Sequence, residues 1–496
     1  MKALPGALGR CLLLLALACW GAPARSAGSF ECGGSVEART WALWEGQARS
    51  LLGNAVIRDA FAARGDTYVL YDLQGYLHNL VAMAERCGRR ERLADIASLL
   101  MPTLDALSEV RGQGPGWICR GGRVCTSANR MLGDEVVLYS AQYMALLTGL
   151  ARGLSGEGEA DDVVERIVRL AVAHLDRWAS APGGFRTAER LAARSPESVR
   201  DGSSRLLFTD ADLWILTFAA DVAGIVDARS DLQPLLAAEP ARRQRRNEAV
   251  ADLSRLLVAR LSLRSVNSQR LGARVVLADI DRGYWRLYPD SRFAGYAGNE
   301  PPLACGSTRA SEAGDAAPQV SIVDSIGWDF SHARRLVHAA ASLDRHREAF
   351  RSTYAVPAAS VPPAGLSAAF AAQLANDVWN GDAEWPLFAN YWDGSNGWYR
   401  VGHDRGAAGC LAGYPPFGLS DAFVTGGFPV WSRHVPLLGT LARRLFELTE
   451  RADDASRAFL RHRYAALSDE AARSTRVLTQ LMFWPALVQP AVSSQS

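Results

Sequence analysis

The chain has 496 residues, of which 49% are hydrophobic and 21% are charged, and its formal net charge at pH 7 is +2. This composition allows a substantial core in one or two domains, while a balanced charge without a basic stripe argues against a nucleic-acid partner. Lys2 is the only lysine and lies in a segment that we expect to be removed, which excludes lysine Schiff bases, pyridoxal-phosphate anchors and phosphate-loop lysines. We expect no cofactor.

The first 27 residues have the order of a secretory signal peptide. A basic start is followed by an apolar run at residues 11–20 and by small residues at Ala22 and Ala24, so we expect cleavage after Ala24. The run is shorter than the roughly 20 residues of a membrane-spanning helix, and we expect no membrane contact after cleavage. Residues 28–496 are predicted to form a single domain. The preference for arginine over lysine and the many alanines indicate a GC-rich bacterial genome, and therefore a periplasmic or secreted bacterial protein.

Six cysteines remain in the predicted mature chain, and an even number in an exported protein predicts up to three disulfides. Cys119 and Cys125 flank the short turn 120–123 and are the pair that we predict, while the other pairings stay open. No two cysteines have the spacing of a zinc site with histidines nearby, so we predict no metal. The six residues are Cys32, Cys87, Cys119, Cys125, Cys305 and Cys410.

Helical periodicity recurs from one end of the mature chain to the other. Apolar side chains fall on one helical face within residues 73–84, 139–150, 164–178, 253–257 and 438–448. Such stripes are typical of amphipathic helices that bury one face. The predicted fold class is all-α.

The predicted helices alternate between two kinds. One kind begins near an acidic residue and is rich in small and aromatic side chains, as in residues 71–76 and 208–214. The other kind is more charged and amphipathic, and its members are residues 91–110, 161–180, 242–263 and 366–379. Alternating inner and outer helices predict an α/α toroid, in which about five to six helical hairpins stack into a closed ring.

Two long insertions interrupt the helical pattern, at about residues 265–318 and 384–416. In the first, residues 275–280 and 284–288 flank a short turn and predict a β-hairpin. In the second, residues 390–401 predict another hairpin around a glycine-rich turn. Long loops on a rigid scaffold usually carry function.

Acidic residues near the starts of the inner helices are the first candidates for a functional site. Loops that enter the inner helices of a toroid converge at one mouth of the ring, where several carboxylates would share a cleft. The competing explanation is that Asp is a favoured N-cap and that acids in a first turn complement the helix dipole. The residues concerned are Asp72, Asp134, Glu135, Asp210, Asp212, Asp329 and Asp421.

A second candidate is the aromatic and polar segment 390–404. Flat rings beside carboxylates and amides suit sugars, whose C–H faces stack on the rings while their hydroxyls need paired hydrogen bonds. The alternative is that these aromatic side chains fill the core or form cross-strand pairs. The candidate residues are Asn390, Tyr391, Trp392, Asp393, Trp398, Tyr399, Arg400 and His403.

A third candidate lies between Gly327 and His338. Asp329 and His332 fall on one helical face, so Asp329 can orient His332 as a base, and Trp328 lies beside them in the sequence. A capping aspartate paired with a surface histidine would look the same. Since motifs of serine hydrolases, zinc peptidases and dinucleotide enzymes are missing, the chemistry is expected to use carboxylates, tyrosines or histidines.

An exported chain of alternating helix pairs with acidic, aromatic-rich entrances to the inner helices resembles the α/α toroid carbohydrate-active enzymes. That superfamily includes glycoside hydrolases, polysaccharide lyases and uronyl epimerases, and the resemblance covers most of the mature chain at the level of architecture. The stretch from Gly413 to Phe428 is also similar to a Tyr-Pro-rich segment late in glucuronyl epimerases. It departs from that segment at too many positions for catalytic roles to be transferred.

The leading hypothesis is an exported glycoside hydrolase that acts on a polysaccharide or oligosaccharide. An inverting enzyme of this kind uses one protonated carboxylic acid for the leaving oxygen and one carboxylate as base for a water molecule. Asp329 is predicted to be one of the two. The other is Asp72, Asp134 or Asp210.

The second hypothesis is a polysaccharide lyase or uronyl C5-epimerase. Tyr399, His332 or His403 would then handle the C5 proton. Arg400 or Asn390 would neutralise the sugar carboxylate. The third hypothesis is a non-catalytic glycan-binding or polysaccharide-assembly protein. In each case Tyr76 and Trp328 are predicted to contact the sugar, and the oligomeric state stays open.

Overall fold

The computed structural model describes residues 28–491, apart from residues 128, 157–160, 182–184, 186, 194–203, 238, 304, 306–322 and 405–408. The predicted signal segment lies outside the described residues. Most of the described chain is α-helical, as the periodicity predicts, and only one β-hairpin among the described residues is longer than a few residues. None of the described helices is long and apolar enough to cross a membrane.

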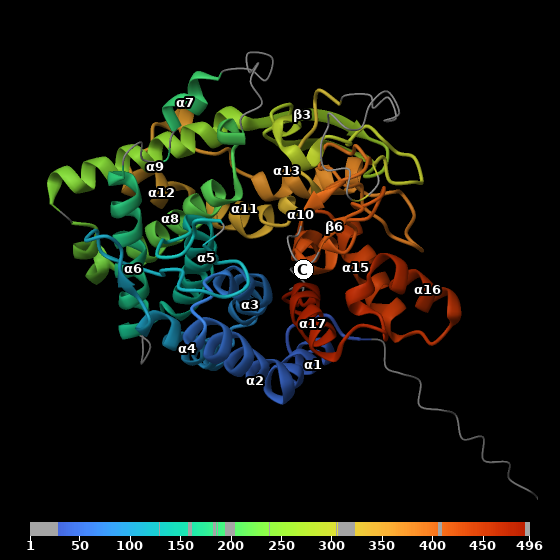
Figure 1. Cartoon of the computed structure of the whole chain (residues 1–496), viewed down its shortest axis with the longest axis horizontal. Coiled ribbons are helices and arrows are strands. Elements are labelled where there is room, and N and C mark those ends of the chain that lie inside the picture. The colour runs from blue at the N-terminus through green and yellow to red at the C-terminus, as the bar shows by residue number, and fades with distance from the viewer. Residues whose placement is uncertain are drawn as a thin grey trace, which may run out of the picture.

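A set of inner helices packs side by side in a closed order (Figure 1). They are α3 (Tyr68–Arg86), α5 (Val137–Leu154), α8 (Asp210–Ala228), α11 (Leu336–Arg345), α13 (Leu366–Gln373) and α17 (Arg473–Leu487). From α3 to α13, each inner helix contacts the next inner helix along the chain. The 3-10 segment Phe428–Arg433 contacts both α13 and α17, and α17 packs against α3. The contacts therefore return to the helix where they began.

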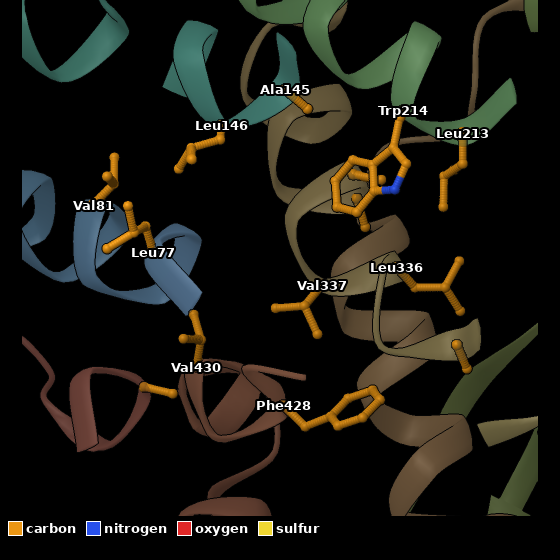
Figure 2. Packing of buried hydrophobic residues seen from close by; sticks show 14 of the residues in the cluster. Leu77, Val81, Ala145, Leu146, Leu213, Trp214, Leu336, Val337, Phe428 and Val430 are labelled. Carbon is orange, nitrogen blue, oxygen red and sulfur yellow. The ribbon is translucent and has the colours of Figure 1, made fainter. Parts of the chain in front are cut away.

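The inner helices are apolar on most sides because most of their sides face other helices. On α5, which contacts both α3 and α8, fourteen of the eighteen residues are buried, including Tyr143, Leu147 and Leu150. A helix that is hydrophobic all round is a buried helix. Figure 2 shows the packing between neighbours, with side chains from five inner segments: Leu77, Leu146, Trp214, Val337 and Phe428.

Outer helices cover this set and carry the charged faces. Among them, α4 (Arg90–Asp105) packs on α3 and α5, α6 (Asp161–Ser180) on α5 and α8, and α9 (Pro240–Arg260) on α6 and α8. The predicted bounds of α6 agree with the structure. The predictions for the other two ran on too long, because the chain turns at Ala106 after α4 and enters a strand at Leu261 after α9. The prediction of a further outer helix at residues 366–379 was wrong, because α13 is buried on nearly all its residues and packs among the inner helices. The remaining described α-helices are α1 (Ser35–Leu43), α2 (Arg49–Leu51), α7 (Thr187–Ala192), α10 (Phe330–Ala333), α12 (Arg347–Thr353), α14 (Ala422–Thr425), α15 (Pro436–Glu450) and α16 (Asp454–Arg463).

The first insertion contains a hairpin, but with a different partner from the predicted one. Strand β4 (Ala273–Ile280) pairs antiparallel with the preceding strand β3 (Leu261–Ser268), so that Leu261 lies opposite Ile280. Residues 284–288 form a 3-10 turn instead of a strand. The carboxylate of Asp281 explains the turn: it accepts hydrogen bonds from Arg260 and from the backbone of Phe208, which holds the chain inward after β4.

The hairpin predicted for residues 390–401 is not present. Tyr391 closes a local turn by donating its backbone N–H to the carbonyl of Ser395 at 3.1 Å. The segment then pairs with distant backbone through isolated bridges at Asp329 and Tyr414 rather than with itself. The ladders elsewhere in the described chain are two residues long: β1 (Ser108–Glu109) with β2 (Pro115–Gly116), and β5 (His403–Asp404) with β6 (Cys410–Leu411).

The structure contains the predicted Cys119–Cys125 disulfide and two that the sequence left open. These two join Cys32 to Cys87 and Cys305 to Cys410. All six cysteines of the predicted mature chain are therefore bridged, which is compatible with an oxidising extracellular compartment.

A buried network of charged side chains ties the inner helices together. Arg152 on α5 lies 2.8 Å from Glu85 on α3 and also pairs with Asp221 on α8. Glu85 pairs in turn with Arg345 on α11. Burial by itself would raise the pKa of Glu85, but the two arginines hold it at about 2.

Replacing Asp221 by Ala is expected to destabilise the protein by about 3–5 kcal/mol, because it leaves Arg152 buried without its full set of counter-charges. Urea denaturation followed by circular dichroism measures this change. Asp252→Ala is the matched control, since Asp252 pairs with Arg255 at the surface, where an ion pair contributes at most about 1 kcal/mol. Equal losses for the two variants would contradict the assigned role of the network.

Candidate functional site

Asp329 and His332 form a close pair at the start of α10. Asp329 caps the helix: its Oδ1 accepts a hydrogen bond from the backbone N–H of His332 at 3.1 Å and from the Ser331 hydroxyl at 2.5 Å. Its Oδ2 lies 2.5 Å from Nδ1 of His332. Burial would raise the pKa of Asp329, but His332 and Ser331 lower it to about 2. Capping and orientation of the imidazole, which looked like alternatives in the sequence, are both performed by the same carboxylate.

Among the described residues, none hydrogen-bonds the other imidazole nitrogen of His332, Nε2. An ionised carboxylate at Nδ1 requires a proton on that nitrogen, so Nε2 is the basic atom in the neutral ring. The side chain of His332 keeps 14% of its surface exposed. The aromatic rings of Trp285, Tyr288 and Trp328 surround it at centroid distances of 5.3, 5.6 and 6.3 Å.

Arg400 and Asp290 form the next part of the site. Arg400 donates from Nε to Asp290 Oδ2 at 2.9 Å, and its backbone N–H donates to the carbonyl of Asp290 at 3.1 Å. The other carboxylate oxygen of Asp290 lies 3.4 Å from Nδ1 of His403. Arg400 also hydrogen-bonds Tyr288, whose pKa is raised to about 12 by burial and by the nearby carboxylates. The Tyr288 phenol is therefore protonated at neutral pH.

Several buried donors around His332 have no hydrogen-bond partner among the described residues. They are the hydroxyl of Tyr399 and the indole N–H groups of Trp285 and Trp328. Burial and the charge of Asp329 raise the pKa of Tyr399 well above its usual value, so its hydroxyl keeps its proton. An unsatisfied buried donor costs about 1–3 kcal/mol.

Arg335 connects the residues around His332 to Asp210, another acid that was predicted for the site. Its Nε lies 3.2 Å from Oδ2 of Asp210 in the first turn of α8, and its Nη1 donates to the carbonyl of Ser331 at 2.8 Å. It also donates to the hydroxyl of Tyr71 on α3. Asp210 therefore belongs to the same end of the inner helices as Asp329, although an arginine lies between them.

A second group of charges surrounds Arg334. Burial raises the pKa of Asp72 on α3 to about 6, and Arg123 and Arg334 lower it only in part. Asp421, just before α14, is solvent-exposed and interacts electrostatically with Arg334. Tyr76 lies one helical turn after Asp72, and burial raises its pKa to about 12. The Arg334 group therefore contains one acid, Asp72, that titrates close to neutrality.

A small polar pocket lies between the inner helices behind Arg334 and Arg335. It holds about 20 Å³ of solvent volume, enough for a single water. His78 and His338 stack there at 3.6 Å, and burial lowers the pKa of both, to about 3 for His338. Gln74 hydrogen-bonds His78 at 2.7 Å. These imidazoles are neutral and form a packed polar network.

Other predicted residues lie away from these groups or inside the core. Asp134 is 41% exposed and pairs with Arg111 at the surface. Asn390 is fully buried, and its amide holds the backbone of Gly397, Pro415 and Leu419. Neither side chain is therefore placed to contact a substrate bound near His332 or near Arg334.

The aromatic residues of the 390–404 segment, apart from Tyr399, also have structural roles. Trp392 is fully buried and donates to the carbonyl of Ala278. Tyr391 donates to the carbonyl of Trp398, and the Trp398 indole donates to that of Gly298. Asp393, a polar residue of the same segment, accepts two hydrogen bonds from Ser395 and shapes the turn.

No metal centre is apparent among the described residues. The one cluster there with three metal-ligating side chains consists of Cys32, Glu37 and Cys87. Its two thiols form a disulfide, and Glu37 pairs with Arg89 at 2.7 Å.

Two important residues were not predicted from the sequence. Asp290 stands in a Tyr-Pro-Asp-Ser turn and Arg334 in a helix start, and neither local pattern differs from ordinary turn and helix chemistry. Their roles arise from neighbours more than 70 residues away, such as Arg400 and Asp421.

No protein-family model matches this chain, and neither a curated protein nor a solved structure matches it.

Proposed function

We propose that this chain is an exported enzyme of the α/α toroid type that removes the C5 proton from a uronic acid unit of a polysaccharide. Polysaccharide lyases and uronyl C5-epimerases both begin with this step. The observation that carries the proposal is the Asp329–His332 pair, in which a buried carboxylate orients an imidazole that keeps part of its surface exposed and lies among aromatic rings. The closed order of the inner helices supports the toroid interpretation.

The chemistry needs a base, donors for the developing negative charge, and an acid. His332 Nε2 takes the C5 proton, and Asp329 stabilises the imidazolium that forms. The electron pair moves into the sugar carboxylate, where Tyr399 and Arg400 stabilise the enolate. In a lyase the C4–O bond then breaks, and the Tyr288 phenol gives its proton to the leaving oxygen. In an epimerase a proton returns to C5 from the opposite face.

Glycoside hydrolysis remains a second candidate because of the Arg334 group. Asp329 is buried, ionised and held by three hydrogen bonds, which suits orientation better than the acid or base role of a hydrolase. Burial raises the pKa of Asp72, in contrast, to about 6. A carboxyl group protonated near neutral pH is what a general acid requires.

One assay separates these functions. The purified mature protein is incubated with a panel of acidic and neutral polysaccharides, and reducing ends are followed together with the ultraviolet absorbance of unsaturated sugars. Both signals on an acidic polymer support a lyase, and exchange of deuterium into C5 without either signal supports an epimerase. Reducing ends alone support the hydrolase. Binding without any of these changes would make the protein a non-catalytic glycan binder and overturn the proposal.

A further inference from the structure

Arg334 differs from its neighbour Arg335 in having no partner. Arg335 is buried and contacts Asp210, Tyr71 and Ser331, whereas Arg334 is half-buried and forms no ion pair or hydrogen bond with any described residue. Its acidic neighbours Asp72 and Asp421 interact with it electrostatically but form no direct ion pair with it. The N–H groups of its guanidinium are therefore open to an acceptor from outside.

The position of Arg334 is built into the packing of α14. A Cβ on Gly426 would lie 2.5 Å from Cβ of Arg334, so only glycine allows this approach. The side chain of Arg334 borders the small polar pocket together with Thr425 and His338. The arginine therefore stands on packed elements that fix its backbone next to the His332 group.

The charges around Arg334 come from three elements. Asp72 on α3 and Asp421 before α14 both interact with it electrostatically, but neither lies within 4.0 Å of its nitrogens. Asp72 also faces Arg123, Asp66 and the phenols of Tyr68, Tyr76 and Tyr139. Asp421 faces the phenol of Tyr464. Asp66 is already used, because it accepts the backbone N–H groups of Tyr68 and Arg123.

We propose that Arg334 is a second carboxylate-binding subsite, which holds the uronate unit next to the one whose C5 proton His332 removes. The inference rests on the proposed function, because it assigns an acidic polymer to the same site. A planar guanidinium matches a sugar carboxylate with two parallel hydrogen bonds. Tyr76 and Arg123 are electrostatic neighbours of Asp72 in the same group.

Binding at this subsite depends on pH through Asp72. Burial raises the pKa of Asp72 to about 6, so this carboxyl group is largely neutral below that pH. It then donates a hydrogen bond to a bound carboxylate. Above that pH Asp72 is ionised, repels the ligand and competes with it for Arg334. The affinity for an acidic oligosaccharide is therefore expected to fall as the pH rises through about 6.

The test measures binding separately from turnover. Isothermal titration is carried out with the full chain carrying His332→Gln, with and without Arg334→Gln, so that the ligand is not consumed. The probes are short oligomers of galacturonate, mannuronate and glucuronate, with a neutral cello-oligosaccharide as comparison. At about pH 5, Arg334→Gln is expected to weaken binding of the matching acidic oligomer about 10- to 100-fold, the effect of losing a charge-assisted ion pair. Arg58→Gln, an exposed arginine, is the matched control and should change nothing.

Three results would overturn the subsite. These are equal affinity with and without Arg334, equal affinity for the acidic and neutral oligomers, and no binding of any acidic oligomer at about pH 5. Asp72→Asn is expected to abolish the fall in affinity with pH. A failure of the proposed reaction gives a different result. If the wild-type protein binds acidic oligomers through Arg334 but neither cleaves them nor exchanges deuterium at C5, the subsite is supported and the proposed enzymatic activity is contradicted.

Discussion

Replacement of His332 by Gln is expected to lower kcat on an acidic polysaccharide by about 10²- to 10⁴-fold, the range that a positioned general base contributes. Glutamine keeps much of the size of the imidazole but has no basic nitrogen. The fold should remain, because His332 lies at the rim of the core and keeps part of its surface exposed. The rate of formation of unsaturated product, or of deuterium exchange at C5, measures the loss.

Asp329→Asn provides a second measure of the same pair. An amide side chain still accepts the capping hydrogen bond from the backbone of His332 but does not stabilise the imidazolium. We expect a similar loss of kcat with a smaller change in KM, because Asp329 is buried and does not contact the substrate.

The control for these variants is His462→Gln, which changes an exposed histidine on α16. Full activity of the His332→Gln enzyme would remove the base from the proposed mechanism. If Asp72→Asn abolished the activity while His332→Gln did not, catalysis would belong to the Arg334 group and the hydrolase candidate would stand.

Reduction of the disulfides is expected to have the largest effect on stability. The chain-entropy relation assigns about 4, 2 and 5 kcal/mol to bridges that span 55, 6 and 105 residues. Their sum is comparable with the whole free energy of unfolding of a typical domain, about 5–15 kcal/mol. The reduced protein is therefore expected to be largely unfolded at 37 °C, the behaviour seen when native bridges are removed from secreted domains.

Paired serine variants separate the three bridges. Replacing both Cys305 and Cys410 should lower the free energy of unfolding more than replacing both Cys119 and Cys125, because the first bridge closes the longer loop. Guanidinium denaturation of each variant measures the difference. An equal or larger loss for the six-residue loop would show that the loop-entropy account does not describe this protein.

The helices could be predicted from the sequence because their cause is local. Residues 161–180 carry an apolar stripe at helical spacing and begin with two aspartates, and the structure has α6 over the same residues. The pair Asp329 and His332 was also predictable, since a capping aspartate binds the backbone N–H of the residue three positions later, and here it also binds the imidazole of that residue.

The insertions were harder to predict because their partners are distant. Residues 275–280 have strand character, but nothing in them shows whether the partner precedes or follows. The buried carboxylate of Asp281 decides this through Arg260 and Phe208. In the same way, the aromatic residues of 390–401 suit a sugar site or a core equally well, and only the backbone carbonyls that they reach place Trp392 and Trp398 in the core.

The mostly helical fold, the Cys119–Cys125 bridge and the residue types available for a site follow from the sequence, because periodicity, loop length and composition are properties of short segments. Which of those residues meet depends on the tertiary packing. Asp290 reaches Arg400 and His403 across more than 100 residues, and Arg334 lies beside two acids from opposite ends of the chain. Such groupings depend on how the inner helices close on one another, and no local pattern encodes that closure.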